Sequence, residues 1–273
     1  MTGVSSAADA LRNSRLKEAV MRRPVVWARH WGLKGEDGFV VSYPRSGTTW
    51  MRFLLYEALT GLPAEFETLY KAIPYIGRQR GAPTLIPPEG RLIFSHETHP
   101  IGARKTTYIV RDPRSVILSH YRFHKRRGEF DGMFEDFFRQ FLDGKTNPFG
   151  AWDAHVNFWL DSEAGRGGNL HMIKFEDLRR DTAGVLEGVI DFFGRPVDRE
   201  RIGQAVANND LEHMREKEDN APTGDHFART KNPEIRFVGA GASSGWKEEL
   251  NPDQIARMAR RLGPTLRRLG YQI

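Results

Sequence analysis

A short apolar run, followed by a turn and an amphipathic helix, constrains the fold of this chain more than any other feature. The apolar run is Gly38–Ser42, and the turn begins at Tyr43 and Pro44. Behind the turn, apolar residues recur at the spacing of one helical face: Met51, Leu54, Leu55 and Ala58. Gly61 and Pro63 then supply stop signals. The pattern predicts a strand, a tight turn and a helix, in that order.

The same kind of signal recurs along the chain. Further strands are expected at Arg91–Ser95, Thr106–Val110 and Leu170–Phe175. Asp112 followed by Pro113 is a typical helix start. Other helical patterns cover Phe134–Leu142, Trp152–Glu163, Thr182–Phe193 and Pro252–Leu269, whereas 64–90, 124–148 and 218–245 show no clear pattern and are interpreted as loops around a site. Strands that alternate with helices predict a single α/β domain, a parallel sheet with helices on both faces.

The turn itself has the composition of a phosphate-binding loop. A helix start offers unpaired backbone N–H groups and the positive end of the helix dipole. Gly47 allows a close approach, Ser46, Thr48 and Thr49 add hydroxyl groups, and Arg45 adds a positive charge. A nucleoside-triphosphate loop has a lysine directly after its last glycine, and Thr48 stands there instead. The alternative is an ordinary turn with incidental hydroxyls.

A second candidate anion site follows the strand Thr106–Val110. Arg111 lies at the strand end, and Ser119 lies about two helical turns further on. Both side chains are expected to reach one phosphate beside the same crevice. Each also has an ordinary alternative, because Arg111 can pair with a surface acid and Ser119 can bond to its own helix.

These two segments resemble those of sulfotransferases that use 3'-phosphoadenosine-5'-phosphosulfate (PAPS). The sequence YPRSGTTW is similar to the family's YPKSGTTW, with Arg45 in place of lysine, and the Arg111/Ser119 spacing is similar to the family's 3'-phosphate signature. The resemblance implies a P-loop-like fold and a PAPS cofactor, released as PAP. It implies that Arg111 and Ser119 bind the 3'-phosphate and that the 5'-phosphosulfate is bound by the loop residues Arg45, Ser46, Gly47, Thr48, Thr49 and Trp50.

Sulfuryl transfer needs a base for the acceptor proton and stabilisation of the leaving phosphate. Arg45 is the candidate on the leaving-group side. The family carries its histidine base in a segment similar to Phe94–Pro100, which implies that His96 is the base; Glu97 is the second candidate and His99 the third. Phe94 stands where the family often has a lysine, so a cation is missing beside the sulfuryl group.

The resemblance extends from about 36 to 250 but weakens toward the carboxyl end. The segment 236–247 is similar to a family loop that covers the nucleotide, yet Gly239 and Ala240 replace its Arg-Lys pair. We expect backbone N–H groups near Gly241 to bind the anion, with Arg236 as a second source of charge. Trp246 either stacks on the base or anchors the loop. Phe175 to Asp177 resembles the family's Tyr-Glu-Asp segment without the tyrosine hydroxyl.

The formal net charge of +6 is concentrated in one terminal segment. Seven of the basic residues lie within 1–34, against Asp9 and Glu18. We interpret 1–34 as a basic helical segment whose tryptophans, Trp27 and Trp31, pack on the domain; peripheral membrane contact is the alternative. No apolar run reaches the roughly 20 residues that span a bilayer, and there is no cysteine, so we expect a cytoplasmic protein.

The sequence as a whole predicts a basic segment at 1–34 and a sulfotransferase domain at 35–273. The expected reaction is in-line transfer of a sulfuryl group from PAPS to a hydroxyl or amine of a small-molecule, lipid or sugar acceptor. We expect no metal and no nucleic-acid partner. The rivals are a P-loop kinase that uses ATP and a non-enzymatic nucleotide domain that binds a membrane or partner. The acceptor and the oligomeric state stay open.

Overall fold

The computed structural model describes residues 25, 27–99, 101–221, 230–239 and 245–273. Its centre is a sheet of four parallel strands in the order β2-β1-β3-β4. The strands are β1 (Gly38–Ser42), β2 (Leu92–Ser95), β3 (Thr106–Val110) and β4 (Leu170–Lys174). Because all four run in one direction, their carboxyl ends meet at one edge. The chain order reverses at β1, which places a ligand crevice outside the ends of β1 and its neighbours.

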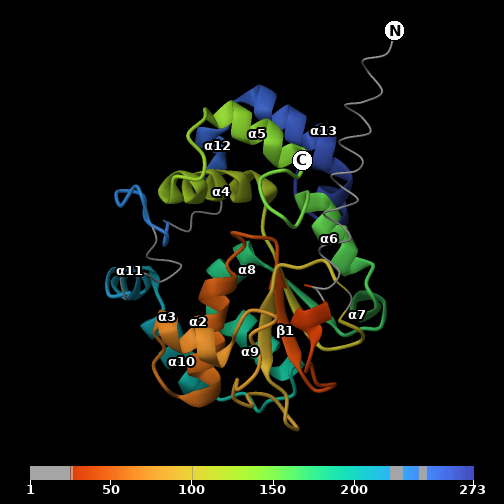
Figure 1. The fold of residues 1–273 in the computed structure, drawn as a ribbon, viewed down its shortest axis with the longest axis vertical. Coiled ribbons are helices and arrows are strands. Elements are labelled where there is room, and N and C mark those ends of the chain that lie inside the picture. Colours follow the sequence, from red (N-terminus) through yellow and green to blue (C-terminus); the bar gives the residue numbers. More distant parts are fainter. Residues whose placement is uncertain (1–24, 26, 100, 222–229, 240–244) are drawn as a thin grey trace.

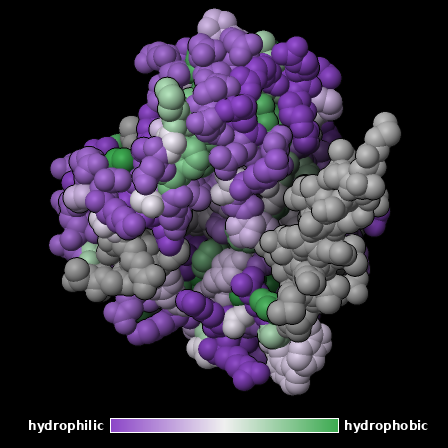
Figure 2. Space-filling model, turned by 45° about the horizontal axis from the view of Figure 1, so that its top comes forward, coloured by the Kyte–Doolittle hydropathy of each residue, from purple (hydrophilic) through white to green (hydrophobic). Residues whose placement is uncertain are grey.

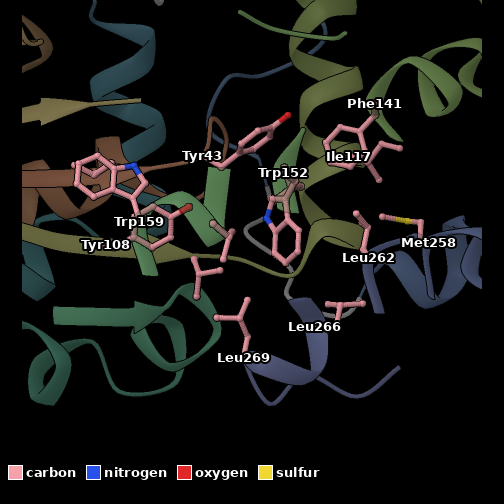
Figure 3. Close-up of a cluster of buried hydrophobic side chains, with 14 of the residues drawn as sticks. Tyr43, Tyr108, Ile117, Phe141, Trp152, Trp159, Met258, Leu262, Leu266 and Leu269 are labelled. Atoms are coloured by element: carbon pink, nitrogen blue, oxygen red, sulfur yellow. The ribbon is translucent and has the colours of Figure 1, made fainter. Parts of the chain in front are cut away.

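Helices cover both faces of the sheet (Figure 1). Successive side chains of β1 and β3 point to opposite faces, so Val41 and Tyr108 join one core cluster while Val40 and Ile109 join the other. The first cluster includes side chains of α4, α5, α6 and α13. Figure 3 shows its tryptophans, Trp152 and Trp159, with Leu262 and Leu266 of α13 and with Leu269, which follows α13. The second includes side chains of α2, α8, α9 and α10. The predicted α/β architecture is confirmed.

Helix boundaries follow local capping chemistry. Asp112 caps α4 by accepting a hydrogen bond from the Arg114 N–H, as predicted. Asp181, Asp198, Asp210 and Asn251 cap later helices in the same way. The helices are α2 (Thr48–Thr60), α3 (Phe66–Ala72), α4 (Pro113–Arg127), α5 (Phe134–Leu142), α6 (Trp152–Leu160), α7 (Glu163–Arg166), α8 (Phe175–Arg180), α9 (Thr182–Phe192), α10 (Arg199–Asn208), α11 (Leu211–Asp219), α12 (Trp246–Glu249) and α13 (Pro252–Arg268).

Two predictions about secondary structure were wrong. The helix expected at Trp152–Glu163 is two helices, because the Ser162 side chain accepts a hydrogen bond from the Gly165 N–H and starts a new one. The stretch 64–90, interpreted as a loop, contains α3, whose capping box joins Glu65 and Thr68.

The described part of the basic segment, 25 and 27–34, lies against the domain through backbone and side-chain contacts. Carbonyl groups of Arg29 and Trp31 accept hydrogen bonds from the Gln79 side chain, both at 2.9 Å. Trp27 and Trp31, however, are 64% and 54% exposed and contact each other edge to face. The expectation that these tryptophans pack on the domain was therefore wrong. Residues 1–24 lie outside the described part of the chain.

Candidate active site

The phosphate loop joins β1 to α2 at the edge where the strands end. Arg45 and Gly47 both have left-handed backbone conformations, with φ of 70° and 103°. A Cβ at Gly47 would lie 2.6 Å from the Phe175 ring, so only glycine fits. No side chain caps α2, and the Ser46 hydroxyl is buried without a hydrogen-bond partner among the described residues. The loop thus keeps unpaired donors at a helix start, as an anion site requires.

Arg45 extends from this loop to α4 and the carboxyl-terminal part of the chain. Its Nε donates a hydrogen bond to the Ser119 Oγ, and its Nη2 donates to the Phe237 carbonyl, both at 3.1 Å. Its guanidinium lies 4.8 Å from the Phe123 ring centre and 4.6 Å from that of Phe237. Burial, and then the neighbouring charge of Arg111, lower the pKa of Arg45 to about 9. The side chain stays cationic at neutral pH.

The second anion site is continuous with the first. Arg111 follows β3, lies over the Phe175 ring at 4.3 Å, and donates a hydrogen bond from Nη1 to the Arg45 carbonyl at 3.1 Å. Burial is the main cause that lowers the pKa of Arg111 to about 10. Ser119 projects from α4 to the same place, where it meets Arg45. The structure therefore brings Arg45, Arg111 and Ser119 together as one cationic surface.

His96 follows β2 and faces the same crevice. Its Nδ1 lies 2.7 Å from the Ser42 carbonyl, which only accepts hydrogen bonds, so Nδ1 carries the proton and Nε2 is the unprotonated nitrogen. Desolvation lowers the pKa of His96 to about 4, and the charges of Arg52 and Arg45 act in the same direction. A neutral imidazole with a free Nε2 is suited to accept a proton at physiological pH.

Glu97, the second candidate base, is held by other partners. Its carboxylate forms an ion pair with Arg29 and accepts a hydrogen bond from the Tyr75 hydroxyl at 2.8 Å. His99 lies 3.9 Å from the same carboxylate. Neither Glu97 nor His99 lines the cavity that contains His96. The structure does not bring either candidate to the two anion sites.

A buried histidine that the sequence analysis did not single out fixes the backbone of His96. His155 of α6 donates from Nε2 to the His96 carbonyl at 3.0 Å, and its Nδ1 accepts a hydrogen bond from the Tyr108 hydroxyl at 2.8 Å. Burial lowers the pKa of His155 to about 3, so it is neutral. Tyr108 and His155 are far apart in sequence, and no local pattern pointed to their meeting.

The loop 143–151 brings an aromatic wall to the other side of His96. Asn147 donates a hydrogen bond to the Tyr43 hydroxyl at 2.6 Å and accepts one from the Phe149 N–H at 2.8 Å. The Phe149 ring centre thereby lies 5.7 Å from that of His96. Burial raises the pKa of Tyr43 to about 12, so its hydroxyl stays protonated and donates to the Gly150 carbonyl. The lone tyrosine of the phosphate loop is therefore the anchor of this wall.

One cavity of about 1260 Å³ is lined by groups from both anion sites and from the surroundings of His96: Arg45, Gly47, His96, Arg111, Ser119 and Phe149. Pockets for a single drug-sized ligand span about 300 to 1,000 Å³, so the cavity has room for a nucleotide together with an acceptor. Trp50 borders one end, where its Nε1 donates to the Asn209 carbonyl at 2.7 Å. In Figure 2 hydrophobic residues, in green, form separate small patches on a mostly hydrophilic face.

The carboxyl-terminal loop reaches the same cavity with Phe237, Gly239 and Trp246. Trp246 lies 3.9 Å from the Arg114 guanidinium, which anchors it next to α4. Arg236 forms an ion pair with Asp219 and is held there. Gly241, predicted to bind an anion through its backbone, lies outside the described residues, as does Ala240.

Comparison with known proteins identifies the family. The family model described as sulfotransferase domain matches residues 35–270 of this chain. This chain belongs to the sulfotransferase domain family. The prediction of a sulfotransferase is confirmed, and the P-loop kinase and the non-enzymatic domain are set aside. No helix in the described part of this sulfotransferase has an apolar stretch long enough to cross a membrane.

Curated relatives include human sulfotransferase 2B1, which is 31% identical over 198 residues. That match covers 67% of this chain and 53% of the human protein, so the chain spans about half the length of this relative. Mouse sulfotransferase 2A2 is 26% identical over 244 residues, and the match covers 81% of each chain.

Solved structures confirm the sulfotransferase fold. Retinol dehydratase in complex with androsterone and the inactive cofactor PAP aligns with a TM-score of 0.70 at 17% identity, over 88% of this chain and 83% of the other. A mouse sulfotransferase complexed with PAP aligns with a TM-score of 0.66 at 20% identity, over 88% of each chain.

Proposed function

We propose that this sulfotransferase moves a sulfuryl group from PAPS to the hydroxyl of an apolar, ring-bearing or polyene alcohol, with His96 as the base. One observation carries the proposal: the free Nε2 of His96 belongs to a ring that lines the same cavity as the phosphate loop and the Arg111/Ser119 pair. Acid-base catalysis, donor binding and acceptor binding then take place within one enclosure.

The donor is bound by the cationic surface. The amides of the phosphate loop and the hydroxyls of Thr48 and Thr49 hold the 5'-phosphosulfate, and Arg111 with Ser119 holds the 3'-phosphate. Unpaired hydrogen-bond donors at the start of α2 and the buried positive charge of Arg45 support this assignment. Two similar structures are complexes with PAP, which supports PAPS as the donor here.

The transfer step follows from the placement of His96. The acceptor oxygen forms a bond to sulfur while the bond from sulfur to the 5'-phosphate oxygen breaks, and the electron pair of that bond leaves with PAP. The acceptor proton moves to the His96 Nε2. The added negative charge on PAP is stabilised by the N–H groups at the start of α2 and by Arg45. The neutral state of His96 supports this role, because a protonated imidazole cannot accept the proton.

The chemistry of the acceptor is inferred from the aromatic side of the cavity. Phe94, Phe149 and Tyr75 line the cavity near His96 and offer apolar surface with few hydrogen-bonding groups. Retinol dehydratase structures contain retinol or androsterone, both apolar alcohols. An apolar alcohol therefore fits better than a sugar.

Radiolabelled PAPS offered with androsterone, retinol, a phenol and a simple sugar tests the proposal. We expect label transfer to the apolar alcohols, and we expect His96→Gln to lower kcat by about 10² to 10⁴-fold, the range for a lost general base, without changing PAP affinity. Glu97→Gln is the matched control, because it removes a neighbouring titratable group outside the cavity. Full activity of His96→Gln, or absence of both PAP binding and transfer in the wild type, would contradict the proposal.

A further inference from the structure

Arg52 is a buried positive charge in the wall of the cavity. It lies in the second turn of α2, is 1% exposed, and lines the cavity together with Phe94 and His96. None of the ion pairs found within the described chain includes it. A buried charge without a counter-charge costs free energy that a purely structural residue has no reason to retain.

The Arg52 guanidinium is held rigidly on one side and lacks a partner on the other. Its Nε donates to the Ile73 carbonyl at 2.9 Å and its Nη2 to the Leu69 carbonyl at 2.8 Å. No described residue accepts a hydrogen bond from Nη1. The guanidinium carbon lies 3.8 Å from the centre of the Phe94 ring. The arrangement fixes a cation in place and leaves its charge uncompensated.

The position of Arg52 differs from that of the two arginines at the anion sites, Arg45 and Arg111. Arg45 and Arg111 point toward Ser119 and Phe175, at the nucleotide side. Arg52 contacts Phe94, whose ring centre lies 5.9 Å from that of His96. A sulfuryl group that is attacked beside His96 therefore lies nearer to Arg52 than a 3'-phosphate bound at Arg111 does.

We propose that Arg52 is the electrostatic partner of the sulfuryl group, a fixed positive charge that stabilises the transition state from the His96 side of the cavity. The inference rests on the proposed function. Arg52 exchanges no proton or electron; it favours the state in which negative charge spreads over the sulfuryl oxygens as the bond to the phosphate oxygen breaks. Arg52 supplies the positive charge that is missing because Phe94 stands where the family often has a lysine. The lowered pKa of His96, to which Arg52 contributes, agrees with this proximity.

Arg52→Gln and Arg52→Lys form the decisive pair. Both side chains donate hydrogen bonds to a carbonyl, but only lysine keeps the charge. We expect Arg52→Gln to lower kcat by about 100-fold, the scale for one lost charge-stabilising group, and Arg52→Lys to retain most of it. Affinity for PAP, measured by calorimetry, should stay unchanged in both, because PAP has no sulfuryl group. The acid limb of the kcat profile should move to higher pH in Arg52→Gln only.

Arg104→Gln is the matched control, because Arg104 also donates to two carbonyl groups, those of Lys34 and Ile101, but does not line the cavity. It should leave kcat unchanged. Equal kcat in Arg52→Gln and wild type, or equal losses in Arg52→Gln and Arg52→Lys with an unmoved pH profile, would overturn the inference and leave the proposed function intact.

A further pair keeps the test decisive if Arg52→Gln does not fold. Phe94→Glu places a carboxylate against the Arg52 guanidinium and neutralises its field while both carbonyl bonds remain, and Phe94→Gln is its neutral counterpart. A lower kcat in Phe94→Glu than in Phe94→Gln supports the inference, and equal values overturn it. Absence of PAP binding and transfer in the wild type would instead refute the proposed function, which this comparison separates from the role of Arg52.

Discussion

The two ends of the cavity are built in different ways. The end that is proposed to bind the nucleotide, called the nucleotide end below, consists of short sequence segments that directly follow strands: the phosphate loop after β1, Arg111 after β3 and Phe175 after β4. The acceptor end around His96 is assembled from distant segments, such as Phe149 in the loop before α6 and Arg52 in α2. Parallel strands bring their own ends together, whereas side chains on helices and loops meet only through packing.

The difference also concerns charge and rigidity. At the nucleotide end, arginines and backbone N–H groups form a polar surface with a fixed loop geometry, in which Arg45 and Gly47 adopt left-handed conformations. At the acceptor end, aromatic rings surround one neutral histidine. The nucleotide end is thus specialised for one anion pattern, and the acceptor end offers shape and apolar surface. Substitutions at the nucleotide end should alter the affinity for the donor, and substitutions at the acceptor end should alter sulfuryl transfer or acceptor binding.

The largest effect is expected for Gly47→Ala. The added Cβ would meet the Phe175 ring at 2.6 Å in a left-handed conformation, so both the loop and the ring must shift. We expect loss of measurable PAP binding in calorimetry and a free energy of unfolding lowered by about 1 to 3 kcal/mol, the usual cost of such strain.

Gly61→Ala is the control for this substitution, because Gly61 has φ of 72° at the other end of α2 and its Cβ would meet no atom closer than 3.5 Å. It should reduce stability but not PAP affinity. Wild-type PAP affinity in Gly47→Ala would show that the loop does not approach the nucleotide closely.

Arg111→Gln should weaken PAP binding by roughly tenfold to a hundredfold, because a hydrogen bond to a charged group is worth about 1.5 to 3 kcal/mol. The kcat at saturating PAPS should change little, since Arg111 lies at the nucleotide end. Calorimetric titration with PAP measures the first effect and label transfer the second. Arg139→Gln, an exposed arginine of α5, serves as the charge control. A fall in kcat with unchanged PAP affinity would contradict the placement of Arg111 at the nucleotide end.

Much of the nucleotide end could be predicted from sequence for a physical reason. Residues 45–50, Arg111 and the Phe175 segment each follow a strand, so predicting a parallel sheet is enough to bring them together. His96 also follows a predicted strand, but its proposed role as the base came from the family resemblance together with that position. The direct contact between Arg45 and Ser119 could not be predicted, because it depends on the rotamer of a long side chain.

The acceptor end shows what sequence patterns leave undetermined. Arg52 stands among apolar residues of α2, and a charged residue at such a position is normally assigned to the solvent face. Arg52 is buried because its guanidinium donates hydrogen bonds to the carbonyl groups of Leu69 in α3 and of Ile73, the residue after α3. Helix α3 was not predicted. His155 and Asn147 are positioned by tertiary hydrogen bonds to tyrosines, for which no local pattern exists.

The pH dependence of kcat should show that His96 stays neutral over an unusually wide range of pH. Burial lowers its pKa to about 4, and a base must be unprotonated, so activity is lost only as the pH falls through that value. We expect a constant kcat from about pH 8 to about pH 6 and a decline below about pH 5. A midpoint near 6.5, the ordinary value for histidine, would mean that the ring is solvated when substrates are bound.

Stability must be followed in parallel, because the same burial acts on folding. His96 and His155 have pKa values below those of the unfolded chain, so protons bind preferentially to the unfolded state. The free energy of unfolding should therefore fall as the pH drops below 6.5, by up to about 1.4 kcal/mol per pH unit for each such histidine. Denaturant titrations at each pH separate this loss from the titration of the base.

The smallest effect is expected for Phe149→Ala, which acts on the acceptor end alone. The ring lies 5.7 Å from His96 and is held by Asn147, so its loss removes apolar surface without touching the anion sites. We expect KM for an apolar alcohol to rise about tenfold, the equivalent of 1.4 kcal/mol within the range for a lost aromatic contact, with PAP affinity unchanged. Phe158→Ala, an aromatic substitution outside the cavity, is the control. If the Phe149 change weakened PAP binding as much as acceptor binding, the cavity would be one undivided site, since a wall that serves only the acceptor cannot affect a nucleotide bound at the other end.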